Sequence, residues 1–224
     1  MKTFLSYLLD DNLSAYGDGQ RISIEITNNQ DNGDSCNGST LTLPTHYGTH
    51  IDFPFHFSKK HRTSNNYSAE DFIFSNILFI DLTDYKHENL LISVETLEKE
   101  FQSTNYDCKA ELLLVKTGFY DKRDQSEYWQ NNLGFGLGTA KYIKKRMPNI
   151  KAIAFDLISI TSYQNRKVGK IVHKEYLIEE DIIIVEDVNL REIDNNTIIN
   201  EIIISPLRVN NLDGAPATII ADIN

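Results

Sequence analysis

Short apolar runs rich in β-branched residues are the sequence feature that most constrains the fold of this chain. Each run has the length of a strand, whereas two segments, one beginning at Ser93 as an N-cap and one covering 139–147, show apolar residues at helical spacing. This pattern fits neither a regular βαβ alternation nor a helical bundle, so we predict a strand-rich mixed α/β fold. The predicted strands cover 22–26, 39–43, 76–82, 111–118, 152–160, 181–187, 200–209 and 217–223.

The runs differ in how their apolar residues are distributed. LLLVK (112–116) and IIIVE (182–186) are apolar almost throughout, which predicts strands covered on both faces. ISIEI (22–26) alternates, which predicts one solvated face. We predict that residues 118–138 form a long polar and aromatic loop of the kind that often borders a site.

Length and charge narrow the function classes. A chain of 224 residues without a low-complexity linker predicts a single domain over residues 1–224. The formal net charge of −10 argues against a nucleic-acid partner, because phosphate binding needs a basic patch. Two cysteines cannot form a disulfide framework, and acids interrupt the apolar N-terminal run, so we expect no signal peptide, no membrane span and a cytoplasmic location.

The stretch HYGTHIDFPFH, residues 46–56, holds three of the six histidines of the chain. Gly48 and Pro54 disfavour a helix, and an extended strand places alternate residues on opposite faces. Because proline cannot donate to a strand ladder, we expect the strand to end near Phe53 and a turn to bring His56 back. One predicted face carries His46, Gly48, His50, Asp52, Pro54 and His56, and the other carries Tyr47, Thr49, Ile51, Phe53, Phe55 and Phe57.

Four potential ligands on one face favour a metal site over a strand edge that faces water. Imidazole nitrogen and carboxylate oxygen hold zinc or manganese without thiolates. We predict that His61, among cationic residues, and His87, in a polar loop, lie on the surface. His173 is the remaining histidine, and Glu186 ends a buried run, where a carboxylate is either paired, metal-bound or at a solvated strand end.

The string H46-x-G48-T49-H50-x-D52-x-P54-x-H56 resembles the signature of the cyclase-like metal hydrolase family, which includes bacterial kynurenine formamidase and isatin hydrolase. The resemblance extends over nearly the whole chain. It includes GDSCNGSTLTLPTHYGTHID (33–52), KTGFY (116–120), VHKEYLIEEDIIIVEDV (172–188) and SPLRVNNLDGAPATIIA (205–221).

The resemblance implies a swivelling β/β/α fold and a role for each matching residue. It makes His46, His50 and Asp52 ligands of a first metal, with Asp52 bridging to a second. His173 would hold that second ion and Glu186 would touch both. His56 would be the catalytic acid/base.

Two positions depart from the family pattern. Tyr16, in AYGDG, stands where the formamidases carry a tryptophan that packs on the substrate ring. The gap from His173 to Glu186 is one residue longer than in the formamidases, with the excess around residues 179–181.

The resemblance also implies an activity. We expect a metal-dependent amidohydrolase that converts N-formylkynurenine, or a similar N-formyl aryl amide, to formate and an amine. The alternatives are a hydrolase of an isatin-like cyclic amide or ester, and a non-catalytic metal- or ligand-binding protein. The expected cofactor is a divalent metal, zinc first and manganese second, with two ions per chain. The expected partners are a small aromatic amide and further copies of the chain, in a homodimer or homotetramer, without nucleic acid or membrane.

Overall fold

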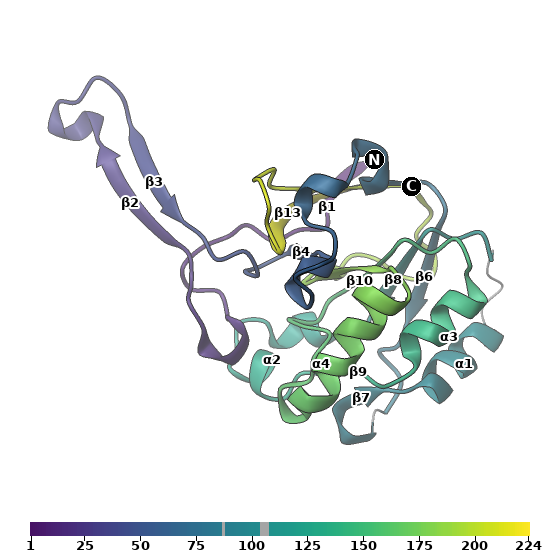
Figure 1. The fold of residues 1–224 in the computed structure, drawn as a ribbon. Coiled ribbons are helices and arrows are strands. Elements are labelled where there is room, and N and C mark those ends of the chain that lie inside the picture. Colours follow the sequence, from purple (N-terminus) through teal and green to yellow (C-terminus); the bar gives the residue numbers. More distant parts are fainter. Residues whose placement is uncertain (87, 104–107) are drawn as a thin grey trace.

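The computed structural model describes residues 1–86, 88–103 and 108–224, so the prediction for His87 lies outside the described residues. Within these ranges the predicted strand-rich mixed α/β class is confirmed, with helices packed against one part of a nine-stranded sheet (Figure 1). Its strands are β1 (Lys2–Phe4), β4 (His50–Asp52), β5 (Ile73–Phe74), β6 (Ile77–Asp81), β8 (Leu112–Lys116), β10 (Ala152–Phe155), β11 (Ile183–Glu186), β12 (Ile199–Pro206) and β13 (Gly214–Ile223). Two small two-stranded sheets are formed by β2 (Ser23–Asn28) with β3 (Gly38–Thr42) and by β7 (Leu91–Ile92) with β9 (Gly134–Phe135).

The main sheet has a parallel half and an antiparallel half that meet at β4. Its order is β5-β12-β13-β4-β11-β10-β8-β6, with β1 paired to β13. The strands β6, β8, β10 and β11 are mutually parallel, whereas β4 runs antiparallel to both β11 and β13. The change of direction therefore lies beside the carboxyl ends of the parallel strands, the place where α/β sheets bind ligands.

Strand β8 is buried on both faces, as its continuous apolar run predicts. Leu113 and Val115 lie in the core beneath the helices, while Leu112 and Leu114 lie in the core between the two halves of the sheet. These four side chains are at most 1% exposed, and each contributes about 1.5–3 kcal/mol by leaving water. Strand β11 is buried throughout for the same reason.

The two predicted helices are present. Helix α1 covers Val94–Ser103 and packs Leu97 and Phe101 into the core, and α3 covers Thr139–Arg146 and packs Ile143 there. We did not predict α4 (Arg166–Lys174), because only Val168, Ile171 and Val172 of its nine residues carry sizeable apolar side chains. The remaining α-helix is α2 (Glu127–Gln130), and a π-helical turn covers Glu175–Glu179. Short 3-10 turns cover Tyr16–Asp18, Gln30–Asn32, Pro54–His56, Ser64–Asn66, Ala69–Phe72, Glu88–Leu90, Phe119–Lys122 and Tyr163–Asn165.

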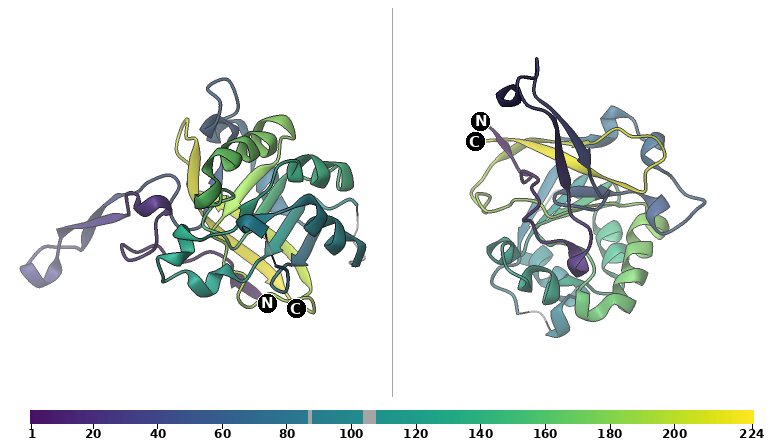
Figure 2. Two further views of the ribbon diagram at one scale, coloured as in Figure 1. Left: turned by 90° about the horizontal axis from the view of Figure 1, so that it is seen from below. Right: turned by 90° about the vertical axis from the view of Figure 1, so that its left-hand side faces the viewer.

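The hairpin β2–β3 projects as an arm from the body of the protein (Figures 1 and 2). Both of its strands are solvated on both faces, so the prediction of a single solvated face for ISIEI is wrong. The alternation has a different meaning here, because cross-strand register puts Ile24 opposite Leu41, on the same face as Ile26. Ile24, Leu41 and Ile26 are 54%, 59% and 68% exposed, respectively. The arm therefore has an uncovered apolar face.

The predicted loop over 118–138 holds short regular elements, namely a 3-10 turn, α2 and the two-residue β9. The loop contacts Asp187, the residue that follows β11. Arg123 donates to both carboxylate oxygens of Asp187, at 2.9 and 2.6 Å, and the Tyr128 hydroxyl donates at 2.6 Å. The loop therefore anchors the end of β11. Among the described helices, none combines the length and the apolar character that crossing a membrane requires.

Candidate metal centre

A cavity of about 370 Å³ lies where β4 meets the carboxyl ends of β10 and β11. The fold brings all of the predicted site residues to its wall, although they come from segments far apart in the chain. None of residues 120–137 is part of the wall. The lining residues are Ala15, Tyr16, Gly19, Gln20, Pro44, His46, His50, Asp52, His56, Phe57, Ile158, Ser159, Thr161, Arg166, Lys170, His173 and Glu186.

Cross-strand register places the carboxylates next to the first histidines. In the antiparallel pair of β4 and β11, His50 lies opposite Glu186 and Asp52 opposite Ile184, so all four side chains share one face. The Nε2 atom of His50 lies 3.4 Å from Oδ1 of Asp52 and 3.3 Å from Oε2 of Glu186. Its Nδ1 lies 2.9 Å from the carbonyl oxygen of Gly48, an acceptor that keeps the proton on Nδ1 and turns Nε2 toward the carboxylates.

The strand predicted from residue 46 to near Phe53 is shorter than expected. Only His50–Asp52 is a strand, so the predicted placement of alternate residues on one face holds for His50 and Asp52 but not for the flanking residues. Gly48 has φ +64°, and a Cβ there would lie 2.2 Å from Cδ2 of Leu9, so the chain turns at this glycine.

The turn predicted after Phe53 exists as the 3-10 turn Pro54–His56. It brings His56 back over His46, with their ring centroids 4.0 Å apart. The two histidines thus meet through turns on either side of β4.

His173 enters the site from α4. Its Nδ1 lies 2.9 Å from the carbonyl oxygen of Gly169 and 3.1 Å from the hydroxyl of Thr161. Its Nε2 lies 3.6 Å from Oδ2 of Asp52 and 3.8 Å from Oε1 of Glu186.

The gap between His173 and Glu186 contains the π-helical turn, followed by Asp181 with φ +53°. A π-helical turn accommodates one additional residue within a helix. The longer gap therefore leaves His173 and Glu186 facing each other across the cavity.

Asp213 is a site residue that we did not predict. Its Oδ2 lies 3.0 Å from Nε2 of His46 and 3.1 Å from Nδ1 of His56, and Thr45 donates to its Oδ1 at 3.2 Å. It precedes Gly214, where a Cβ would lie 2.4 Å from Cε1 of His46. The signal available in the sequence was the Asp-Gly pair ahead of a long apolar strand, but nothing local connects that pair to residues more than 150 positions earlier.

The charges of the site are strongly coupled. Burial lowers the pKa of His46, but the negative charge of Asp52 and the hydrogen bonds that His46 donates to Asp213 and Asp52 raise it to about 9. Burial also opposes ionisation of His50, yet its hydrogen bonds with Asp52 and Glu186 hold its pKa well above the ordinary value. Burial favours the neutral form of Asp52, but the charge of His46 outweighs this and holds the pKa of Asp52 well below its usual range. Protons on the histidines therefore neutralise the carboxylates when no cation is present.

The donor set fits a divalent metal. Oxygen and nitrogen ligands about 2.1 Å from a tetrahedral ion lie about 3.4 Å from one another, which matches the separations around His50, Asp52 and Glu186. His50, Asp52 and Glu186 form one buried group with ligand atoms within 4.8 Å, and His46, Asp52 and His56 form a second. Asp52 belongs to both groups, and the Nδ1 atoms of His50 and His173 are held by backbone oxygens, as is usual for metal-binding histidines.

Aromatic and cationic residues form the mouth of the cavity. The hydroxyl of Tyr16 is buried and has no hydrogen-bond partner among the described residues, and burial raises its pKa. Its ring lies 5.7 Å, edge-on, from the ring of Tyr163, which in turn stacks beneath the guanidinium of Arg166 at 4.6 Å. Lys170 follows one helical turn later. His61 lies away from the site and is exposed, as predicted.

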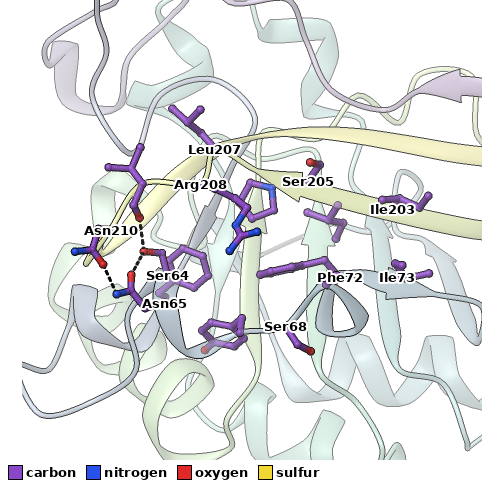
Figure 3. A pocket seen from close by; sticks show the side chains of 16 residues that line it. Ser64, Asn65, Ser68, Phe72, Ile73, Ile203, Ser205, Leu207, Arg208 and Asn210 are labelled. Carbon is purple, nitrogen blue, oxygen red and sulfur yellow. Dashed lines mark hydrogen bonds between the residues drawn. The ribbon is translucent and has the colours of Figure 1, made fainter.

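A larger cavity, of about 580 Å³, lies between residues 64–73 and the end of β12 (Figure 3). Ser64 donates to the carbonyl oxygen of Val209 at 2.7 Å and ties the two segments together. Its lining, all from described residues, contains no histidine, cysteine, aspartate or glutamate. The larger cavity therefore offers no acid–base or metal-binding chemistry, and the smaller one is the candidate site.

Comparisons with known proteins find relatives over most of the chain. The family model described as "Putative cyclase" matches residues 4–162. The kynurenine formamidase of Bacillus cereus is 25% identical over 216 residues, which is 95% of this chain and 92% of that protein.

Solved structures share the fold. Isatin hydrolase A from Ralstonia solanacearum superimposes with a TM-score of 0.79 at 16% identity, covering 99% of this chain and 91% of that one. A "predicted metal-dependent hydrolase from Bacillus stearothermophilus" gives a TM-score of 0.74 at 18% identity, covering 99% and 97%.

Proposed function

The chain belongs to the putative cyclase family, and from this premise we propose that it is a metal-dependent hydrolase of the kynurenine formamidase type. Its substrate is N-formylkynurenine or a similar N-formyl aryl amide, and its products are formate and the amine. The observation that supports this most is the convergence of His46, His50, Asp52, His173 and Glu186 in one cavity, with His56 beside them.

We propose that these five residues hold two divalent ions, zinc or manganese. His46, His50 and Asp52 would hold the first, and Asp52, His173 and Glu186 would hold the second. When bound, the metal supplies an activated water near neutral pH and polarises the amide carbonyl. The two carboxylates offset the cationic charge in a buried place.

His56 moves the proton. Its side chain is 29% exposed, in contrast to 4% for His50, so it can meet both water and substrate. Asp213 accepts a hydrogen bond from Nδ1 of His56, which leaves Nε2 free to take a proton from the attacking water and return it to the leaving nitrogen. Asp213 is thus a positioning residue, because the same carboxylate oxygen also fixes Nε2–H of His46.

Tyr16 contacts the substrate in this proposal. Its ring lines the cavity, and its buried hydroxyl has no partner within the described ranges, so it can pack on the substrate ring and donate one hydrogen bond.

A substrate comparison tests the activity. Metal-loaded protein is incubated with N-formylkynurenine and with isatin, and formate release and lactam opening are followed separately. We expect turnover of N-formylkynurenine. Turnover of isatin alone would support the cyclic-amide alternative, and absence of both activities would remove both named substrates.

His56→Asn tests the assignment of roles. We expect full metal content with activity lost, because the acid/base is absent while the ligands remain. Equal loss of metal and activity would make His56 a ligand, as its place in the group with His46 and Asp52 also allows. Unchanged activity would favour a non-catalytic binding protein.

We further propose that the protein is a homodimer or homotetramer. A two-stranded hairpin is at best marginally stable in water, and the arm exposes Ile24, Ile26 and Leu41 on one face. A second copy is the occupant that explains this face. Light scattering of wild type and of the Ile24→Ser, Ile26→Ser variant tests it, with dissociation expected in the variant and a monomeric wild type contradicting the proposal.

A further inference from the structure

The face of α4 that carries His173 also carries two cations. Arg166, Lys170 and His173 are spaced i, i+4 and i+7, so they lie along one side of the helix, and all three line the cavity. At 1.5 Å per residue, the Cα of Lys170 lies about 4.5 Å and that of Arg166 about 10.5 Å from that of His173 along the axis. The cations therefore lie on the same wall as the proposed metal ligand, toward the mouth.

Neither cation has an ion-pair partner in the part of the chain that the structure describes. Among the described residues, no carboxylate lies within ion-pair distance of Arg166 or Lys170, although ion pairs form at Arg21, Arg62, Arg123, Lys151 and Arg191. Both side chains line the cavity, so they place positive charge at its mouth although the chain as a whole carries a formal net charge of −10. Such a pair attracts an anion from solution.

The guanidinium of Arg166 is also oriented. It lies 4.6 Å above the ring of Tyr163, and this ring packs edge-on against Tyr16 at 5.7 Å and Trp129 at 4.8 Å. Stacking uses the face of a guanidinium and leaves the N–H groups in its plane available, the arrangement that binds a carboxylate with two hydrogen bonds.

Resting on the proposed function, we propose that Arg166 and Lys170 bind a carboxylate of the substrate. The substrate class is then an N-formyl aryl amide that bears a carboxylate, with its amide at the metal ligands, its ring beside Tyr16 and its acid group at the mouth. This class includes N-formylkynurenine and excludes neutral lactams such as isatin as the preferred substrate.

Paired probes test the inference. N-formylanthranilate carries a carboxylate, whereas formanilide has the same amide and ring without it. For wild type we expect a kcat/KM roughly ten-fold or more higher for N-formylanthranilate, since a hydrogen-bonded charge contributes this much. In Arg166→Gln and Lys170→Gln we expect KM for N-formylanthranilate to rise about ten-fold each, with formanilide unaffected. Lys167→Gln, one position along α4 and outside the cavity wall, is the matched control and should behave as wild type.

A binding measurement separates this inference from the proposed function. Calorimetric titration with anthranilate, a carboxylate that is not hydrolysed, should show binding to wild type and a roughly ten-fold or greater loss of affinity in the double variant Arg166→Gln, Lys170→Gln. Hydrolysis of neither amide would count against the proposed function, while the titration would still decide whether the mouth binds carboxylates. Equal affinity of anthranilate for wild type and double variant, or no binding to wild type, would overturn the inference.

Discussion

Replacing Asp213 tests how the two histidines are held. One oxygen of this carboxylate contacts Nε2 of His46 at 3.0 Å and Nδ1 of His56 at 3.1 Å. A hydrogen bond to a charged group contributes about 1.5–3 kcal/mol and a neutral one about 0.5–1.5 kcal/mol. Because the side chain of Asp213 is 34% exposed, the lower ends of these ranges apply.

The magnitudes follow for two variants. Asp213→Ala removes both contacts. The loss of about 2–3 kcal/mol of interactions that orient the histidines corresponds to about a 30- to 160-fold lower kcat. Asp213→Asn can keep a neutral oxygen toward both imidazoles and turn its amide toward Thr45, so we expect about a ten-fold loss. KM for N-formylkynurenine should change little, because Asp213 is not part of the cavity wall.

The assay combines steady-state kinetics with metal content and imidazole nitrogen NMR of the zinc form. The expected spectra show the Nδ1–H tautomer of His56 in wild type and a mixture of tautomers in Asp213→Ala. Asp194→Asn is the control, because it alters an exposed carboxylate that is not part of the cavity wall. A kcat for Asp213→Ala within two-fold of wild type at equal metal content would refute the positioning role.

Three further predictions concern Gly214, His46 and Asp156. Gly214→Ala places a Cβ 2.4 Å from Cε1 of His46, so His46 must move. Metal affinity, measured by competition with a chelator, should then fall at least ten-fold, and unchanged affinity would contradict the contact. The pKa of His46 is about 9 in the metal-free protein, above the value of about 6.5 for an unperturbed histidine. Its proton therefore stabilises the metal-free fold fully below about pH 6.5, and this stabilisation is lost as the pH rises through 9. Metal must displace that proton, so affinity should rise about ten-fold per pH unit between 7 and 9, and a flat profile would argue against His46 as a ligand. Burial raises the pKa of Asp156 to about 6 despite hydrogen bonds from Thr117 and Gly118. This residue therefore favours folding at low pH, and its contribution to the stability of the fold falls as the pH rises from about 4 to 6. The NMR signal of its carboxyl carbon should titrate near pH 6, and a midpoint below 4 would contradict the prediction.

The predictable part of the fold is the part with a local cause. Continuous apolar runs such as Leu112–Lys116 predict buried strands because every side chain on both faces needs an apolar environment, and that pattern is present in the letters themselves. The alternation of ISIEI is also a local pattern, but it does not indicate whether other parts of the chain cover the apolar face. Here the hairpin projects away from the body of the protein, so that face stays uncovered. Helix α4 was missed because few of its residues are apolar and its buried side also carries Gly169 and His173.

The candidate site divides in the same way. The proximity of His46, His50, Asp52 and His56 could be predicted because they are close in sequence. Strand β4 is only three residues long, however, and turns on either side of it bring His46 and His56 together. The approach of Asp213 to two histidines depends on the pairing of β13 with β4, a contact across more than 150 residues. No local pattern encodes such a pairing. The same holds for the π-helical turn Glu175–Glu179, which follows the helix that carries His173.

Formate release by metal-stripped and metal-reconstituted protein tests the central claim most directly. The proposed centre predicts that stripped protein does not hydrolyse N-formylkynurenine, and that zinc or manganese restores hydrolysis in proportion to bound metal until two ions per chain are present. Hydrolysis at an undiminished rate by the stripped protein, or no formate from protein that holds its full metal complement, would contradict the assignment of this cavity as a hydrolytic metal centre.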